Sequence, residues 1–263
     1  MKKTMVSVVL ACAAVSISAM AQSQSGLKLY DNFDGRIINP SKWSPVSECI
    51  GQVMECVREV KDDHLRLRVR DYGATDTNDG SQQGISQLGL ASNSVTDIAA
   101  DLTVSYSAAQ ACSTNSGFGG GAHAQVLLFG RFFNGGLGTF DDDVQAFLQL
   151  DRYATDPAGQ VPVSAQLLHQ GQFFGYVSLG FVNVGERVRV ELVWDQPNHQ
   201  FIVRLFRPRY GTTAEQFMPY TISDTTPPQF PNRILSAAAY GANCVGSRKS
   251  AEVEVLFDDV FTN

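Results

Sequence analysis

The sequence has little positive charge and no long apolar run beyond its N-terminus. Its 263 residues carry 20 Lys and Arg against 26 Asp and Glu, a net charge of −6. Such a chain lacks the basic surface that phosphate backbones require, so we expect no nucleic-acid partner. No later stretch reaches the ~18 apolar residues of a spanning helix, so we expect no membrane span. The 44% hydrophobic content excludes a disordered protein.

The first residues have the pattern of a secretory signal peptide. A lysine pair precedes an apolar stretch, and a small-x-small cleavage site ends at Ala21. The pattern predicts a signal peptide at residues 1–21 and a mature chain at residues 22–263, located in the periplasm or outside the cell. A lipoprotein acylated at Cys12 is the alternative, but cleavage there would leave an unusually short apolar core.

Four cysteines remain in the mature chain: Cys49, Cys56, Cys112 and Cys244. An even number in an exported protein predicts two disulfides. Three pairings are possible, and we favour Cys49–Cys56 with Cys112–Cys244 because the first pair closes a short local loop. The sequence has neither a CxxC motif nor a closely spaced histidine pair, which disfavours a zinc site.

Apolar and polar residues alternate with a period of two along most of the mature chain. Leu65, Leu67 and Val69 alternate with three arginines, for example. This pattern is typical of half-buried strands, and no segment shows a capped helical period. Turn residues separate roughly a dozen such runs, which predicts an all-β, two-sheet sandwich forming one domain over residues 22–263. Residues 124–133 are apolar on both faces, so we expect a central strand covered on both sides.

The two ends of the mature chain carry a recognisable frame. Asp31-Asn32-Phe33-Asp34-Gly35 is followed by Trp43, and the closing strand at residues 253–260 reads Val-Glu-Val-Leu-Phe-Asp-Asp-Val. Together with the hairpin at residues 188–205, this frame resembles bacterial concanavalin A-like (LamG or jelly-roll) secreted domains. The resemblance implies a curved jelly-roll sandwich of antiparallel strands that binds or cleaves glycans, with its first and last strands side by side.

The active-site patterns of the best-known relatives are missing. Glucanase- and carrageenase-type domains use a Glu-x-Asp-x-(x)-Glu strand, and alginate lyases use a Gln-(Ile/Val)-His strand; neither occurs here. Two acidic pairs, Glu252/Glu254 and Asp141/Asp143, have the spacing of neighbours on one strand face. We interpret the first as a solvated face and the second as a charged turn.

One strand has outward residues suited to holding a sugar. They are Gln145, Phe147, Gln149, Asp151 and Tyr153. Aromatic rings stack on sugars and planar polar groups bond hydroxyls, so we take these five as the candidate ligand-binding residues. The competing interpretation is that they cover a sheet edge or face solvent.

Two sets of arginines lie on strand faces. Arg66, Arg68 and Arg70 form one set, and Arg187 and Arg189 form another. They either bind an anionic glycan or pair across strands with carboxylates such as Glu252 and Glu254, and the excess of acid in the chain favours pairing.

Calcium is the one candidate cofactor. The resembled fold brings its ends together, which would place Asp34 near Asp258 or Asp259, and oxygen ligands suit a hard cation. The alternative is that these acids cap strand turns. The stretch at residues 76–80 is one residue short of the spacing in a calcium loop and lacks the closing Glu.

Nothing in the sequence supports a hydrolytic triad. The four histidines are scattered and no Gly-x-Ser-x-Gly elbow occurs. We therefore expect an exported module that binds carbohydrate, or another ligand outside the cytoplasm, without catalysis. The alternatives are an atypical glycan hydrolase or polysaccharide lyase, and a structural or adhesive envelope protein.

Overall fold

The computed structural model describes most of residues 22–263. The described residues are 26–51, 53–73, 82–90, 92, 94–112, 122–242, 244 and 248–263, with the backbone alone described at 45–48, 82 and 83. The predicted signal peptide with Cys12 and the stretch at 76–80 that resembles a calcium loop lie outside them.

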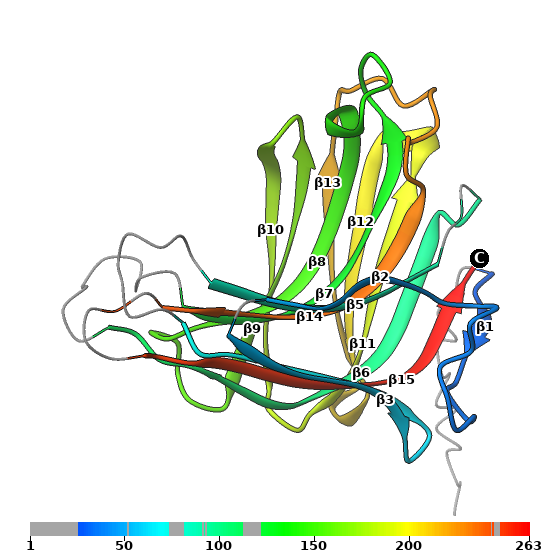
Figure 1. Cartoon of the computed structure of the whole chain (residues 1–263). Coiled ribbons are helices and arrows are strands. Elements are labelled where there is room, and N and C mark those ends of the chain that lie inside the picture. Colours follow the sequence, from blue (N-terminus) through cyan, green and yellow to red (C-terminus); the bar gives the residue numbers. More distant parts are fainter. Residues whose placement is uncertain are drawn as a thin grey trace, which may run out of the picture.

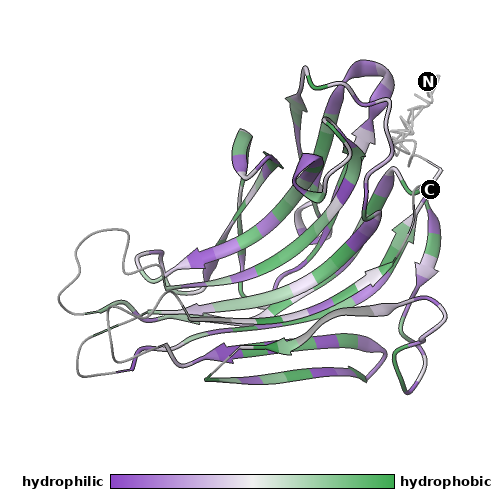
Figure 2. Ribbon diagram, turned by 45° about the horizontal axis from the view of Figure 1, so that its top comes forward, coloured by the Kyte–Doolittle hydropathy of each residue, from purple (hydrophilic) through white to green (hydrophobic). Residues whose placement is uncertain are grey.

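The alternation of the sequence becomes alternation of burial in the strands. In β4 (His64–Asp71) the three apolar side chains are fully buried, whereas the arginines between them are half-buried. Figure 2 shows the same alternation of hydrophobic and hydrophilic residues along many strands. Side chains at positions i and i+2 share a face of a strand, so one face enters the core and the other meets solvent.

The described strands form two antiparallel sheets. The eight-stranded sheet runs β13 (Thr212–Pro219), β12 (Gln200–Arg207), β11 (Arg187–Asp195), β6 (Asp97–Ala109), β15 (Ala251–Thr262), β4, β3 (Met54–Lys61), and β1 (Lys28–Asp31) pairs with β15. The seven-stranded sheet runs β10 (Gln172–Asn183), β9 (Gln160–His169), β8 (Asp143–Tyr153), β7 (His123–Asn134), β14 (Asn232–Gly241), β5 (Gln82–Leu90), β2 (Ser44–Ile50). Three single-turn 3₁₀ helices occur at Phe140–Asp142, Gln196–Asn198 and Pro208–Tyr210.

The all-β, two-sheet antiparallel sandwich is thereby confirmed, with fifteen described strands instead of about a dozen. Among the described residues, no helix is long and apolar enough to cross a membrane. Both sheets bend together, and the seven-stranded sheet lies on the inner side of the bend (Figure 1). Each sheet has one face toward the other sheet and one face away from it. The face of the seven-stranded sheet that points away from its partner is the concave face of the molecule, and the corresponding face of the eight-stranded sheet is the convex face.

The first and last described strands lie side by side, as the resemblance implied. Strand β1 pairs antiparallel with β15, and the C-terminus lies beside β1 in Figure 1. Asp31 is the last residue of β1, and its side chain is buried. Its Oδ2 accepts a hydrogen bond from Trp43 Nε1 at 2.6 Å. The Asp31 and Trp43 of the sequence frame thus form one buried structural contact.

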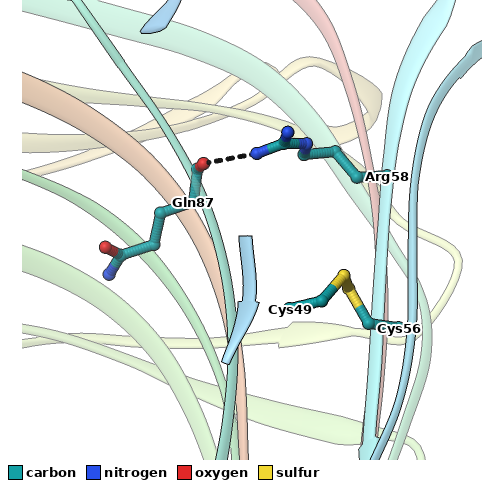
Figure 3. Close-up of a disulfide and its surroundings, with 4 residues drawn as sticks. All are labelled: Cys49, Cys56, Arg58 and Gln87. Atoms are coloured by element: carbon teal, nitrogen blue, oxygen red, sulfur yellow. Dashed lines mark hydrogen bonds between the residues drawn. A yellow bond between two sulfur atoms is a disulfide. The ribbon is translucent and has the colours of Figure 1, made fainter. Parts of the chain in front are cut away.

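Both predicted disulfides are confirmed, and each joins one sheet to the other. Cys49 of β2 bonds to Cys56 of β3, the edge strands of the two sheets (Figure 3). Cys112 follows β6 and bonds to Cys244, which follows β14. The two bridges therefore fasten the sandwich at two separate places.

Candidate functional site

The five candidate residues lie on the concave face. On β8, the residues that alternate with them are at most 1% exposed and point into the core: Val144, Ala146, Leu148 and Leu150. The intervening side chains therefore face outward. Those side chains are Gln145, Phe147, Gln149, Asp151 and Tyr153.

Strand register arranges the concave face in rows. Residues directly opposite each other in an antiparallel pair share a face. Phe129 of β7 lies opposite Phe147 on one side and Ile234 of β14 on the other. In the next row, Leu127 lies opposite Gln149. The residues of one row come from segments up to about a hundred positions apart in the chain.

A hollow of about 360 Å³ opens on this face. It is lined by Ile85 and Gln87 of β5, Leu127, Phe129 and Arg131 of β7, Gln145 and Phe147 of β8, and Ile234, Ser236, Ala238 and Tyr240 of β14. Its floor is apolar: the rings of Phe129 and Phe147 stack with centroids 5.2 Å apart, and Leu127 and Ile234 pack with them. Two of the five candidate residues thus line the hollow, and the other three lie further along β8.

The second apolar face of β7 was misinterpreted from the sequence. We expected the strand at residues 124–133 to be covered on both sides, but Leu127, Phe129 and Arg131 line the hollow. Their low exposure, 8% for Leu127 and 6% for Phe129, comes from packing against neighbours in a bent sheet. A run of apolar residues has the same sequence pattern whether it faces a groove or lies beneath another layer. The pattern therefore could not identify Leu127, Phe129 and Arg131 as residues of the hollow.

The amide groups on the concave face divide into two kinds. Gln149 is held by its neighbours: its Oε1 accepts from Gln125 Nε2 at 3.3 Å and from Gln166 Nε2 at 3.1 Å, and its Nε2 donates to Ser164 Oγ at 3.1 Å. The amides of Gln145 and Gln87, in contrast, form no side-chain hydrogen bond to any described residue, and both line the hollow. These two can donate to and accept from a ligand.

Asp151 is a buried carboxyl group beyond the hollow. It is 6% exposed, and its Oδ1 has no hydrogen-bond partner among the described residues. Burial raises its pKa from 3.8 to about 7, against the opposing effect of hydrogen bonds from Tyr153 and Gln125. The raised pKa lets Asp151 keep its proton at a higher pH than an exposed carboxyl group, and a protonated carboxyl group can donate a hydrogen bond.

Three rings stack at this end of the concave face. The His123 ring lies between those of Tyr153 and Tyr240, with centroid distances of 4.9 Å and 3.9 Å. Burial, followed by the neighbouring Asp151, raises the pKa of Tyr153 to about 12. Each ring comes from a different strand, so no local sequence motif predicts the cluster.

Arg131 lies at the opposite end of the hollow. Its guanidinium group lies 4.3 Å from the ring centre of Phe140, its Nε is 4.0 Å from Asp143 Oδ2, and burial lowers its pKa. Asp143 is fully buried and accepts from the backbone N–H groups of Gln229 and Phe230. Asp142 likewise accepts from Thr139. Asp141 and Asp142 lie in the 3₁₀ turn before β8, as the charged-turn interpretation expected, whereas Asp143 is the buried first residue of the strand.

The other acidic pair and the arginines lie on the convex face and bind each other. Arg66 Nη2 lies 2.7 Å from Glu254 Oε2, and Arg68 pairs with Glu252. Arg70 Nε is 3.6 Å from Glu252. The pairing interpretation is confirmed for this set. The interpretation of the acidic pair as a solvated face is wrong for Glu252, which is 7% exposed because the arginines cover it on the face opposite the hollow.

The structure places the calcium candidates on separate features. Asp34 is exposed in the loop after β1, whereas Asp258 on β15 lies 2.6 Å from Arg187. Arg187 also contacts Asp101, and Arg189 Nε lies 2.5 Å from Asp101. No group of three or more His, Cys, Asp or Glu suited to a metal ion occurs within the described residues. The calcium site at Asp34, Asp258 and Asp259 stays a prediction.

Comparisons with known proteins find similarity in structure alone. No family model matches the chain, and no curated protein sequence matches it. The CBM2 module of the evolved Dit protein of Lactobacillus casei BL23 phage J-1 superposes with a TM-score of 0.46 at 12% identity, covering 87% of this chain and 93% of that module. A putative beta-glucanase from Mycobacterium abscessus gives 0.46 at 11% identity, with coverage of 90% and 98%.

Lectin II from Ulex europaeus gives a TM-score of 0.32 at 11% identity, covering 82% of this chain and 97% of the lectin. At these identities and TM-scores, none of the three similarities assigns an activity to this chain.

Proposed function

We propose that this protein is an exported module that binds glycans in the concave hollow without catalysis. The observation that supports this most strongly is the pairing of two kinds of group in one hollow. The stacked rings of Phe129 and Phe147 offer an apolar surface. Around it lie the amides of Gln145 and Gln87, which form no side-chain hydrogen bond to another described residue. A sugar has apolar C–H faces and hydroxyl groups at its rim, so it matches both.

The positions of the carboxyl groups near the concave face favour binding over hydrolysis. Asp156 lies close enough to Asp151 to raise its pKa, but its Oδ2 accepts a hydrogen bond from the backbone N–H of Tyr153. Asp143 and Asp151 both point to this side of β8 but are eight positions apart, which is ~25 Å along a strand. Glycosidases need two carboxyl groups about 5 to 9.5 Å apart. Asp143 is moreover occupied by backbone donors.

A second candidate function rests on Asp151. A buried carboxyl group with a pKa of about 7 is suited to act as a general acid, and Tyr153 lies beside it. The atypical hydrolase or lyase therefore stays the alternative. It predicts new reducing ends or unsaturated sugars on incubation with a glycan panel, and loss of that product in Asp151→Ala.

The binding proposal is tested by affinity electrophoresis of the mature protein in gels that contain laminarin, xylan, galactomannan, alginate or polygalacturonate. We expect retardation by at least one polysaccharide and about tenfold weaker binding in Phe147→Ala. Phe217→Ala is the matched control, because Phe217 is an exposed ring on the convex face. Absence of retardation by any of the five would contradict the proposal and favour a structural or adhesive role.

Export is the remaining part of the proposal. The signal pattern at residues 1–21 and the two disulfides are both suited to an oxidising compartment, the periplasm or the cell exterior. Expression of the full chain with fractionation of the cells tests it: we expect a mature protein that begins at Gln22 outside the cytoplasm.

A further inference from the structure

Strand β10 exposes three aromatic side chains at the edge of the seven-stranded sheet. Phe173 is 62% exposed, Tyr176 is 66% exposed and Phe181 is 44% exposed. Single exposed rings are common on protein surfaces, but three on one edge strand form a patch that indicates a contact surface.

All three rings face the concave side. Tyr176 lies opposite Gln166, whose amide donates to Gln149 on that face. The Phe173 ring lies 6.3 Å from that of Phe147, the floor of the hollow. Phe181 precedes Val182, which packs into the core. The Phe181 side chain therefore points away from the core, to the concave face.

Two bulges produce this arrangement. In a regular strand, residues three or five positions apart lie on opposite faces, so Tyr176 would point away from both Phe173 and Phe181. The register with β9 shifts by one residue between Phe174 and Tyr176, and again between Ser178 and Gly180. Each shift reverses the alternation once, which brings the three rings to one face. Gly175 at φ 64° and Gly180 at φ 96° supply the backbone conformation that these irregularities need.

The same surface carries no formal charge. Strands β9 and β10 contain no Asp, Glu, Lys or Arg in their twenty-two residues. Edge strands in soluble proteins ordinarily carry charged residues that prevent association. An exposed, aromatic and uncharged edge is therefore suited to an uncharged occupant.

The surface is continuous with the hollow. One row of the sheet runs from Phe129 through Phe147 and Gln166 to Tyr176. This row therefore consists of three aromatic rings and one amide on neighbouring strands of the same sheet. A ligand that leaves the hollow across β8 meets β9 and then the edge strand β10.

We propose that the concave face binds one uncharged glycan chain of several sugar rings, and that the rings beyond the hollow stack on Phe173, Tyr176 and Phe181. This inference rests on the proposed glycan binding in the hollow. Its consequence is that affinity depends on chain length: a short fragment fills the hollow alone, whereas a longer chain also contacts β10.

The test compares intact neutral polysaccharide with its short fragments, using whichever of laminarin, xylan or galactomannan retards the protein. We expect the intact chain to bind more tightly than short fragments. The double variant Tyr176→Ala/Phe181→Ala should lose about tenfold in affinity for the intact chain and nothing for the fragments. Phe217→Ala should bind both like the wild type, and near-ultraviolet circular dichroism of each variant verifies its folding.

Other outcomes overturn the inference in distinguishable ways. Retardation by alginate or polygalacturonate alone would refute an uncharged ligand. Equal affinities for short and intact chains, with an unchanged double variant and a weakened Phe147→Ala, would refute the role of β10 but leave the hollow as the site. A wild-type dimer that becomes a monomer in the double variant would make β10 an interface between two copies. Absence of binding to all of the polysaccharides would refute the proposed function together with this inference.

Discussion

Two buried ionisable side chains, those of Arg233 and Asp151, differ in the number of hydrogen bonds that compensate for their burial. Arg233 is 1% exposed and has no carboxylate partner among the described residues, yet its guanidinium group donates to the carbonyl groups of Arg131, Asn232 and Val95 and lies 3.8 Å from the ring centre of Phe132. Asp151 is buried without comparable compensation. Burial lowers the pKa of Arg233 and raises that of Asp151, because it disfavours the charged form of each group.

The raised pKa of Asp151 predicts a pH dependence of stability. The folded state retains a proton up to about pH 7, whereas the unfolded state releases it near 3.8. Between these values the folded state binds more protons, so the free energy of unfolding decreases as pH rises. The decrease amounts to at most about 4 kcal/mol. Asp151→Asn removes the titration and should flatten the profile, measured by urea unfolding at about pH 5 and about pH 8. Parallel profiles for the two proteins would contradict this explanation.

A second prediction at the residue scale concerns Asp31. Its Oδ2 accepts from Trp43 Nε1, and its Oδ1 lies 3.2 Å from Lys42 Nζ. Asp31→Ala would leave the buried indole N–H without a partner and should lower the free energy of unfolding by about 1 to 3 kcal/mol. Asp34→Ala, three positions away and exposed, should change it by less than about 0.5 kcal/mol. Denaturant unfolding measures both, and equal effects would refute the assigned role of Asp31.

At the scale of elements, the two disulfides hold strands of different sheets together. Each disulfide crosses from one sheet to the other, and the Cys112–Cys244 bridge packs with Ala122 and Ala242. Ala122 directly precedes His123, and Ala242 lies two positions after Tyr240. The long bridge therefore supports the end of the concave face where the three rings stack.

Removal of the two bridges should have unequal effects. The linked cysteines are 132 and 7 positions apart, and loop-closure entropy grows with that separation. The double variant Cys112→Ser/Cys244→Ser should lose about 5 kcal/mol, and Cys49→Ser/Cys56→Ser about 2.5 kcal/mol, in the chain-entropy estimate. Guanidinium unfolding under oxidising conditions measures the order. A larger loss for the short loop would show that native contacts outweigh loop length.

At the scale of the whole molecule, the ion pairs of the convex face contrast with the uncharged edge that β9 and β10 form. The convex face carries cross-strand ion pairs such as Arg204 with Glu191 and Glu215, whereas the described edge of the concave face is uncharged. Partly exposed pairs contribute little stability individually. Their arrangement keeps one face hydrated and leaves the aromatic residues of the other available for contact.

The core predicts how the molecule unfolds. One cluster of buried residues includes side chains from strands of both sheets, so neither sheet has a separate core. We expect a single transition in differential scanning calorimetry, with the calorimetric and van't Hoff enthalpies equal. Two resolved transitions would contradict the single domain predicted for residues 22–263.

Local patterns were sufficient to predict much of the fold. Alternation depends only on residues two positions apart, so strands such as β4 and the hairpin of β11 and β12 could be read directly from the sequence. The disulfides followed from an even cysteine count and short spacing. The residues that point outward from β8 could also be predicted, because the prediction needed only the alternation within that strand.

The rest depends on pairing between distant segments. Sequence alternation assigns each residue to a side of its strand but does not say whether that side is concave, convex or covered. The apolar face of β7 lines a hollow only because the sheet bends and β8 and β14 lie beside it. Tyr176 joins Phe173 on one face only because a bulge opposite β9 reverses the alternation. The sequence alone therefore determined the strands and the bridges, whereas tertiary structure decided the site, because its rows form between residues that are neighbours only after the sheets assemble.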